Sequence, residues 1–133
     1  MTYVERIFEY IDLPTEPPAS MPTDPSTSWP SSGKIVIRDV SLRYRDGLPL
    51  ALDGVNLTIE PKQRVGIVGR TGSGKSTLTL ALFRIVEIAG GTIEIDGVNI
   101  AKMGLTALRK GLTIIPQVNF GIAFVTFLAY MFA

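Results

Sequence analysis

Residues 69–76 read GRTGSGKS, which matches the pattern G-x-x-x-x-G-K-[ST] at every specified position. This pattern is typical of a loop that surrounds phosphate groups. Gly72 and Gly74 permit backbone conformations and close approaches that a Cβ atom would prevent, so successive amides can point at phosphate oxygens. Lys75 would neutralise the β- and γ-phosphates, and the hydroxyl of Ser76 would ligate Mg²⁺.

Such a loop must lie between a strand and a helix. Residues 64–69 form a compact apolar run, which predicts a strand buried on both faces. Apolar residues then recur at helical spacing: Leu78, Ala81, Leu82, Ile85 and Val86. They predict a helix that ends at Gly90-Gly91. The alternative, an ordinary glycine-rich turn, is disfavoured because the full motif has its required context.

The remaining pattern predicts short strands and one further helix. The expected strands are residues 35–44, 55–59, 92–95, 98–100 and 112–115. Asp96-Gly97 predicts the two-residue turn of a hairpin. A brief helix is expected at residues 105–110. Strands that alternate with helices around a phosphate loop indicate an α/β domain.

The N-terminal residues predict a helix followed by a linker. Thr2 and Glu5 have capping-box spacing, and apolar residues follow at helical intervals up to residue 13. Residues 14–30 contain six of the nine prolines, which sustain neither helix nor sheet. Within this linker, Trp29 is interpreted as an anchor that packs on the next domain, rather than as a platform for a ligand.

The composition excludes several classes of function. The 133 residues include 13 Lys and Arg and 12 Asp and Glu, so there is no excess of positive charge that would favour a nucleic-acid partner. The chain has no cysteine, which excludes disulfides and thiolate-ligated metals. It has no histidine either, which excludes histidine bases and Ser/His/Asp triads.

Together these motifs resemble the first half of an ABC transporter nucleotide-binding domain, specifically the second such domain of the subfamily C (multidrug-resistance-associated) exporters. The resemblance lies in WPSSGKIVIRDVSLRYR at 29–45, VGIVGRTGSGKST at 65–77, LFRIVE at 82–87 and LRKGLTIIPQ at 108–117. VERIFEYIDLPTE at 4–16 is similar to the segment that follows the last transmembrane helix of such exporters. The implied fold is an incomplete P-loop NTPase (ABC ATPase) domain with an N-terminal β subdomain.

The resemblance also implies ligands, partners and location. ATP and Mg²⁺ are the expected ligands, and ATP-driven transport is the activity of the intact family. The expected partners are transmembrane domains and a second nucleotide-binding domain, at the cytoplasmic face of a membrane. A small P-loop kinase or GTPase is disfavoured because no N-K-x-D stretch is present.

Two further residues take roles from the resemblance. Tyr44 matches the adenine-stacking aromatic, although its neighbours fit an edge-strand packing residue equally well. Gln117 matches the Q-loop glutamine, which contacts Mg²⁺ or the attacking water; by itself it would be a loop residue. The expected nucleotide-binding residues are Tyr44, Gly69, Arg70, Thr71, Gly72, Ser73, Gly74, Lys75, Ser76, Thr77 and Gln117, and the expected Mg²⁺ ligands are Ser76 and Gln117.

The hydrolytic apparatus of the family is missing from this sequence. No acidic residue follows Asp96, so the strand that ends in Asp-Glu (Walker B) is absent. The LSGGQ signature and the switch histidine are absent as well. No catalytic residue is therefore expected, and the resemblance predicts nucleotide binding without hydrolysis.

The last residues depart from the family pattern. Residues 111–133 carry no charged side chain, and residues 118–133 match no family motif. Three interpretations stay open: a buried or mis-specified segment, a membrane anchor, or an interaction helix. The alternative function is accordingly a non-catalytic membrane-associated or interaction fragment. The expected division is 1–30 as helix and linker, 31–117 as the half-domain and 118–133 as an apolar tail.

Overall fold

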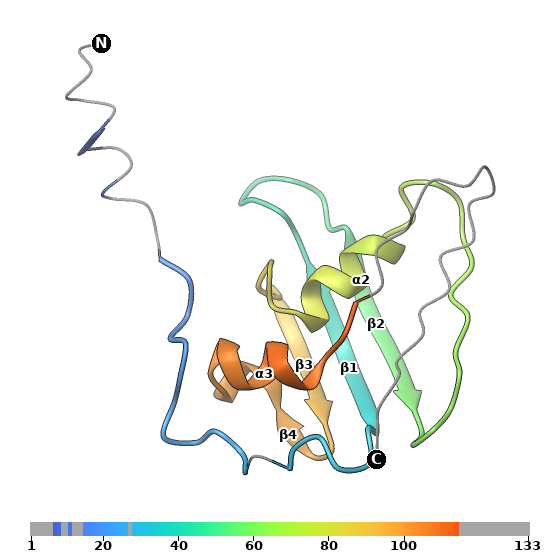
Figure 1. Cartoon of the computed structure of the whole chain (residues 1–133). Coiled ribbons are helices and arrows are strands. Elements are labelled where there is room, and N and C mark those ends of the chain that lie inside the picture. Colours follow the sequence, from blue (N-terminus) through green and yellow to red (C-terminus); the bar gives the residue numbers. More distant parts are fainter. Residues whose placement is uncertain (1–6, 9–10, 12–14, 27, 115–133) are drawn as a thin grey trace.

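A four-stranded antiparallel sheet forms the centre of the computed structural model, which describes residues 7–8, 11, 15–26 and 28–114 (Figure 1). The strands are β1 (Ile35–Leu42), β2 (Leu52–Ile59), β3 (Gly90–Ile95) and β4 (Val98–Asn99). Their order in the sheet is β2-β1-β3-β4. Ile35 of β1 pairs with Ile59 of β2 on one side and with Ile95 of β3 on the other. β1 is therefore an inner strand whose register fixes both neighbours.

A bulge in β1 keeps its apolar residues on one face. Ile37 and Val40 are both buried although they are three positions apart, a spacing that would put them on opposite faces of a regular strand. The pairing register with β2 shifts between these two residues, and Asp39 between them has a φ of 51°. An added Cβ on Gly91 of β3 would collide with the carbonyl oxygen of Asp39. The bulge therefore requires glycine on the neighbouring strand.

Two short helices complete the core. α2 (Lys75–Leu82) and α3 (Leu105–Gly111) lie over the same face of the sheet, and the short 3₁₀ helix η1 (Ile100–Lys102) leads into α3 (Figure 1). The largest fully buried side chains are Val40, Leu42, Ile93, Ile95, Met103 and Leu108. α2 adds Leu78, Ala81 and Leu82 to this core. Because helices this short are marginal alone, packing on the sheet supplies most of their stability.

Several elements predicted from the sequence are confirmed. The runs at residues 35–44 and 55–59 lie largely within β1 and β2, and α3 occupies the predicted brief helix. Asp96 and Gly97 connect β3 and β4 with φ angles of 50° and 77°, as a two-residue turn with positive φ at both positions requires. Of the helix predicted at residues 2–13, the structure describes residues 7, 8 and 11, which are helical and exposed.

The strand predicted at residues 64–69 is wrong. The described residues 63–70 form no strand, and Val68 is 87% exposed. Residues 112–114 of the other predicted strand form none either, and Ile114 is exposed. A strand buried on both faces needs pairing partners and cover. The described part of the chain supplies no pairing strand at these two segments, although Val65, Ile67 and Leu112 are partly buried against the core.

The helix predicted to reach Gly90 is also shorter than expected. α2 ends at Leu82, and Arg84 adopts the left-handed conformation with a φ of 48°. The guanidinium of Arg84 is buried and donates to the carbonyl oxygens of Ile100 and Met103, both at 2.9 Å. These bonds hold the segment after α2 against η1. Ile85, predicted on the buried helix face, is 58% exposed as a result.

The proline-rich linker is bound along α3. Its described residues form neither helix nor strand, as predicted. No side chain of α3 caps its N-terminus. Instead the first amides donate to the strap, which we define as residues 15–24: Gly104 to Asp24, Leu105 to the carbonyl of Pro18, and Thr106 to the carbonyl of Ala19. The strap therefore serves as the N-terminal cap of α3.

Trp29 is an anchor, as predicted. Its indole Nε1 donates to the carbonyl oxygen of Ile95 at 3.2 Å, and its ring packs against the core. An added Cβ on Gly111 would lie 2.7 Å from the ring, so α3 ends in close contact with it. No helix among the described residues is long and apolar enough to cross a bilayer, and the tail at residues 118–133 lies outside them.

Asp96 organises the turn before β1. Its carboxylate accepts hydrogen bonds from the amides of residues 31–34 and from the hydroxyl of Ser32, at 2.5–3.0 Å. Partial burial acts to raise the pKa of Asp96. The hydrogen bonds from Ser32, Gly33 and Lys34 outweigh burial and hold that pKa far below its usual range.

We predict that Asp96→Asn lowers the free energy of unfolding by about 2 kcal/mol at pH 6, because the amides lose a charged acceptor. A depressed pKa contributes stability above the unfolded value, near 3.9, and loses it as pH falls further. The difference between wild type and variant should therefore shrink between about pH 5 and pH 3. Urea denaturation at both ends of this window measures it.

Asp53→Asn is the matched control, because Asp53 is exposed on β2 and makes no hydrogen bond through its side chain among the described residues. Its curve should follow that of the wild type. Equal stability of Asp96→Asn and wild type at pH 6 would contradict the assignment.

Candidate functional site

The phosphate-loop motif opens α2 in the structure. Residues 71–74 turn the chain, and Ser73 donates from its amide to the carbonyl oxygen of Arg70 at 3.1 Å. The helix begins at Lys75, after Gly74 in the N-cap position. No side chain caps this end, and no acidic residue lies in the first turn. The helix N-terminus therefore keeps its positive end open toward an anion.

Gly74 brings the loop against the sheet. Its φ of 86° lies in the left-handed region, and an added Cβ would lie 2.6 Å from the carbonyl oxygen of Ala51. It would also lie 3.0 Å from a side-chain carbon of Leu52. Gly72 has a φ of 82° but open space around it. Both glycines of the motif are thus required by backbone conformation, and Gly74 by contact as well.

Lys75 folds back over the loop. Its Nζ donates to the carbonyl oxygens of Gly69 at 2.8 Å and Arg70 at 2.7 Å. These bonds place the ammonium group beside the loop that precedes its own helix. An ammonium carries three donor hydrogens, so one remains for a phosphate oxygen. The arrangement can bind an anion between the cation and the helix N-terminus.

The other predicted residues of the motif lie around this position. Ser76 is exposed in the first turn of α2, where its hydroxyl is accessible to a cation. The remaining polar side chains of the loop are exposed: Arg70, Thr71 and Ser73. The described residues hold no cluster of three or more acidic, histidine or cysteine side chains. Gln117, the second predicted Mg²⁺ ligand, lies outside them.

Tyr44 reaches this site from the loop between β1 and β2. Its hydroxyl lies 2.8 Å from Oγ1 of Thr77, which follows the motif on α2. Tyr44 is 49% exposed, whereas Thr77 is 5% exposed. The structure therefore brings Tyr44 and Thr77 together. This bond is not apparent from the sequence, because the two residues are separated by 33 positions.

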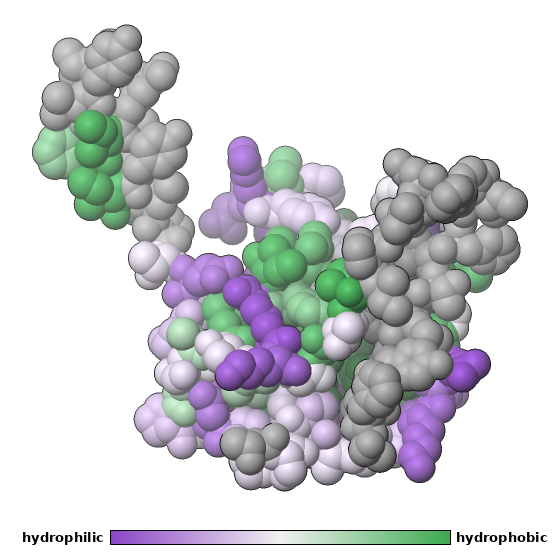
Figure 2. All heavy atoms as spheres, in the orientation of Figure 1, coloured by the Kyte–Doolittle hydropathy of each residue, from purple (hydrophilic) through white to green (hydrophobic). Residues whose placement is uncertain are grey.

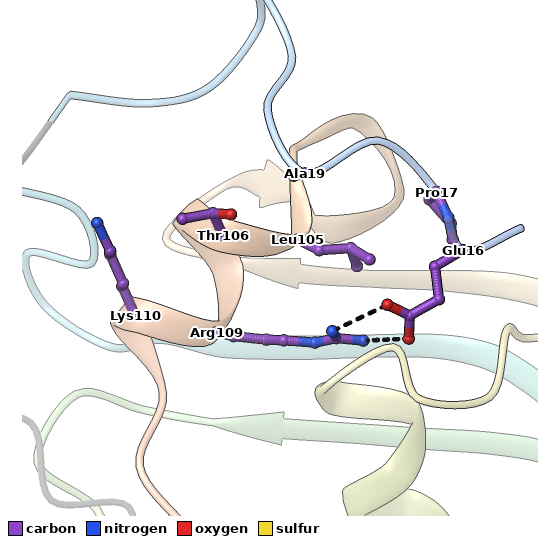
Figure 3. Close-up of a pocket in the computed structure, with 7 residues that line it drawn as sticks. All are labelled: Glu16, Pro17, Ala19, Leu105, Thr106, Arg109 and Lys110. Atoms are coloured by element: carbon purple, nitrogen blue, oxygen red, sulfur yellow. Dashed lines mark hydrogen bonds and ion pairs between the residues drawn. The ribbon is translucent and has the colours of Figure 1, made fainter.

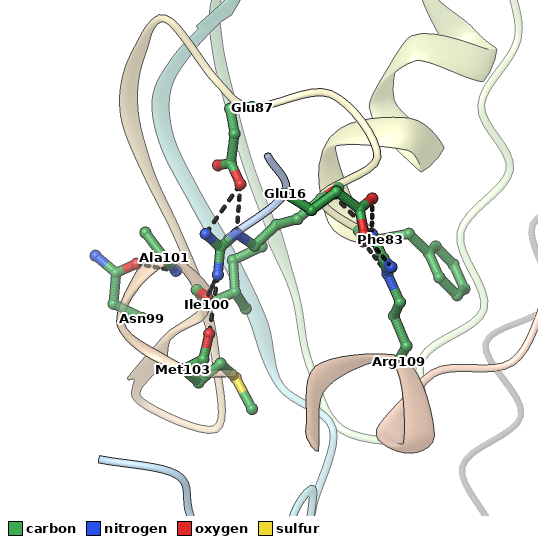
Figure 4. A network of polar contacts seen from close by, with 9 residues as sticks. Glu16, Phe83, Glu87, Asn99, Ile100, Ala101, Met103 and Arg109 are labelled. Atoms are coloured by element: carbon green, nitrogen blue, oxygen red, sulfur yellow. Dashed lines mark hydrogen bonds and ion pairs between the residues drawn. The ribbon is translucent and has the colours of Figure 1, made fainter. Parts of the chain in front are cut away.

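A second polar cluster lies at the opposite end of α2 (Figure 4). Arg109 of α3 donates to the carbonyl oxygens of Phe83 and Arg84, both at 3.2 Å. It also forms a bidentate ion pair with Glu16 of the strap. Arg84 pairs with Glu87 at 2.9 Å. This cluster could not be predicted from the sequence, because most of its acceptors are backbone carbonyl oxygens, which every residue type has.

The charges in this cluster stabilise one another. The hydrogen bond from Arg109, followed by its charge, lowers the pKa of Glu16. The bond to Glu16 in turn raises the pKa of Arg109. An open depression of about 400 Å³ lies beside the pair, lined by the strap and α3 (Figure 3). Because its guanidinium and carboxylate are bound to each other, the depression is structural rather than a site of chemistry.

Apolar side chains also reach the surface. Figure 2 shows them over the side of the sheet that carries α2. Large apolar residues exposed after β2 include Val68, Ile85 and Ile114, all more than half exposed. Val68 and Ile114 belong to the two segments that are predicted as strands, of which only residues 64–69 are predicted to be buried. Exposed apolar residues of this size are typical of surfaces that contact other parts of a protein or another molecule.

The fold and the phosphate loop define a P-loop nucleotide-binding domain. Residues 52–128 match the family model described as ABC transporter. The chain is 57% identical over 114 residues to ABC transporter C family member 8 of Dictyostelium discoideum, and 54% identical over 115 residues to ABC transporter C family member 3 of Arabidopsis thaliana; each alignment covers 86% of the chain. This chain belongs to the ABC transporter family, and the predicted resemblance to subfamily C is confirmed.

A solved structure supports the same assignment. A bacterial Atm1-family ABC exporter with ATP bound aligns with a TM-score of 0.73 and 33% identity, over 86% of this chain and 20% of the exporter chain. The chain spans 7% and 8% of the two curated relatives. It corresponds to part of the nucleotide-binding domain of exporter-type ABC proteins.

We predict that Gly74→Ala destabilises the chain by roughly 1–3 kcal/mol, because alanine would be strained at this φ and its Cβ would meet the carbonyl oxygen of Ala51. The midpoint of thermal unfolding should fall by several degrees. Gly66→Ala is the control, since φ there is not positive and the added Cβ has no neighbour within 4 Å. Equal midpoints for both variants would contradict the close approach of the loop to the sheet.

Proposed function

We propose that this chain binds ATP through its phosphate loop, as the first half of the second nucleotide-binding domain of a subfamily C exporter. The observation that carries the proposal is the position of Lys75. Its ammonium group is held by the carbonyl oxygens of Gly69 and Arg70 beside the uncapped start of α2. A cation and open helix amides in one loop suit a chain of phosphates.

The bound nucleotide would extend from α2 toward β1. Its β- and γ-phosphates lie at Lys75 and the loop amides, and the exposed loop side chains add contacts at the rim. The base stacks on the ring of Tyr44, which is half exposed near α2. Aromatic stacking tolerates any base, because every base has a π-face.

Ser76 fits a role as Mg²⁺ ligand, because its hydroxyl oxygen is exposed beside Lys75 and hard cations prefer oxygen. Gln117 is proposed as the second protein ligand. Mg²⁺ at this position would neutralise charge between the β- and γ-phosphates. Ser76 and Gln117 would orient the triphosphate around that ion.

The chain is proposed to bind without hydrolysing. No carboxylate follows Asp96 in the sequence and no histidine is present, so the chain has no match to the family's Asp-Glu strand or to its switch histidine, which act on the attacking water. Hydrolysis and transport are activities of the intact transporters of the family, which also contain transmembrane domains and a second nucleotide-binding domain. The corresponding location is the cytoplasmic face of a membrane.

One observation favours a second function. Val68, Ile85 and Ile114 expose apolar surface of a kind that is typical of contacts with another molecule. A non-catalytic fragment that associates with a membrane or with another protein would use this surface. The two functions differ in their dependence on Lys75, which the second does not need.

We predict that Lys75→Ala weakens binding of a fluorescent ATP analogue at least tenfold, since the motif loses its charge at the β- and γ-phosphates. Fluorescence anisotropy with Mg²⁺ present measures the affinity. Lys102→Ala is the matched control, because it removes the same charge from an exposed position on η1.

The control should bind like the wild type. Equal affinities for wild type and Lys75→Ala would contradict the phosphate-loop assignment and favour the interaction fragment.

We also predict that the purified chain releases no phosphate from ATP above the rate of Lys75→Ala, because it lacks a group to position water. A coupled phosphate-release assay at saturating ATP and Mg²⁺ tests this. Turnover that persists through purification and is lost in Lys75→Ala would show that the chain holds a catalytic group after all.

A further inference from the structure

The loop between β1 and β2 is fixed to α2 at two separate points. At its start, the hydroxyl of Tyr44 lies 2.8 Å from Oγ1 of Thr77. At its end, Gly74 packs closely on the carbonyl oxygen of Ala51. The amide of Ala51 also donates to the carbonyl oxygen of Leu42 at 2.8 Å, which closes the loop on the sheet. The position of Tyr44 is therefore set relative to the first turn of α2.

The bond holds Tyr44 by its polar tip and leaves much of the residue accessible. Tyr44 is 49% exposed, although its hydroxyl is bonded to a residue that is 5% exposed. The hydroxyl end of this ring lies beside the first turn of α2, which begins at Lys75. Such a ring offers a face on which a planar base can stack.

Thr77 has the hydrogen-bonding capacity for this task. A hydroxyl provides one donor and two acceptor positions, and Thr77 lies two residues after Lys75 in the same helical turn. When Tyr44 donates to Thr77, the threonine proton remains available to the nearby anion site. When the direction reverses, Tyr44 still stays bonded. In either case the β-branched side chain of Thr77 is stiff and the tyrosine is held in place.

We propose that Thr77 is a positioning residue: through its hydroxyl it holds the Tyr44 ring at the distance from the phosphate loop that a nucleoside triphosphate needs for simultaneous contacts of base and phosphates. The proposal rests on the proposed function and deepens it. Its consequence is that base binding and phosphate binding are coupled through one buried hydroxyl. A probe without a base does not use this coupling.

The test compares two probes on the full chain: ATP and inorganic tripolyphosphate, each with Mg²⁺, by isothermal titration calorimetry. Tyr44→Phe keeps the ring and removes the hydroxyl, while Thr77→Val keeps the shape and removes the other partner. Each variant should weaken ATP binding about three- to tenfold, the worth of one net hydrogen bond. Tripolyphosphate should change by less than about twofold in Tyr44→Phe and by less than ATP does in Thr77→Val.

The double variant should bind ATP no more weakly than the weaker single variant, because both changes break the same bond. Thr77→Ser restores the hydroxyl and should recover much of the ATP affinity. Thr79→Val is the matched control on the same helix, since the Thr79 hydroxyl makes no hydrogen bond among the described residues. It should leave both affinities unchanged. Circular dichroism verifies the fold of each variant.

Four outcomes overturn the inference. If Thr77→Val weakens both probes equally and Tyr44→Phe weakens neither, Thr77 contacts phosphate directly and does not position the ring. If the two single effects on ATP add, the residues act independently. If the wild type binds neither probe, the proposed function fails and this inference fails with it. If the wild type binds both probes and the ratio of the two affinities is unchanged in both variants, the inference is overturned while the proposed function stands.

Discussion

Helix α2 must be held at both ends, because eight residues do not form a stable helix by themselves. At its start, Gly74 lies against the carbonyl oxygen of Ala51, and Thr77 bonds to Tyr44. At its end, Arg84 and Arg109 bind the carbonyl oxygens of the neighbouring segments. The buried apolar face of α2 supplies the energy of docking, and these polar contacts fix its position. The geometry of the phosphate loop depends on that fixed helix.

The backbone conformation of the loop at residues 69–76 could be predicted because phosphate-binding chemistry restricts residue types at fixed spacing. Glycines with positive φ and a lysine after them leave a sequence pattern, as does the Asp96-Gly97 turn. The strand at residues 64–69 could not be judged in the same way. An apolar run of this kind forms a buried strand only where neighbouring strands lie beside it. The described chain provides no such partner, so local pattern and observed structure diverge there.

The contacts that hold the strap and α2 were invisible in the sequence for a different reason. Arg109 binds Phe83 and Arg84 through their carbonyl oxygens, which every residue possesses. The amides of α3 find their acceptors in a segment about 80 positions earlier in the chain. Such pairs become apparent only when the fold brings them together. The Trp29 anchor was easier to anticipate, since a lone large aromatic in a polar linker is usually buried.

The attachment of the strap to α3 defines a path for mechanical force. Tension on the chain before residue 15 would first act on the exposed ion pair of Glu16 with Arg109, which contributes little stability by itself. It would then act on the backbone hydrogen bonds that cap α3. Arg109 also donates to the carbonyl oxygen of Arg84, just after the C-terminus of α2, and Lys75 lies at the N-terminus of that helix. Arg109 thus connects the two helices and the strap in series, so that the strap, α3 and α2 form one chain of polar contacts that ends at the helix of the phosphate loop.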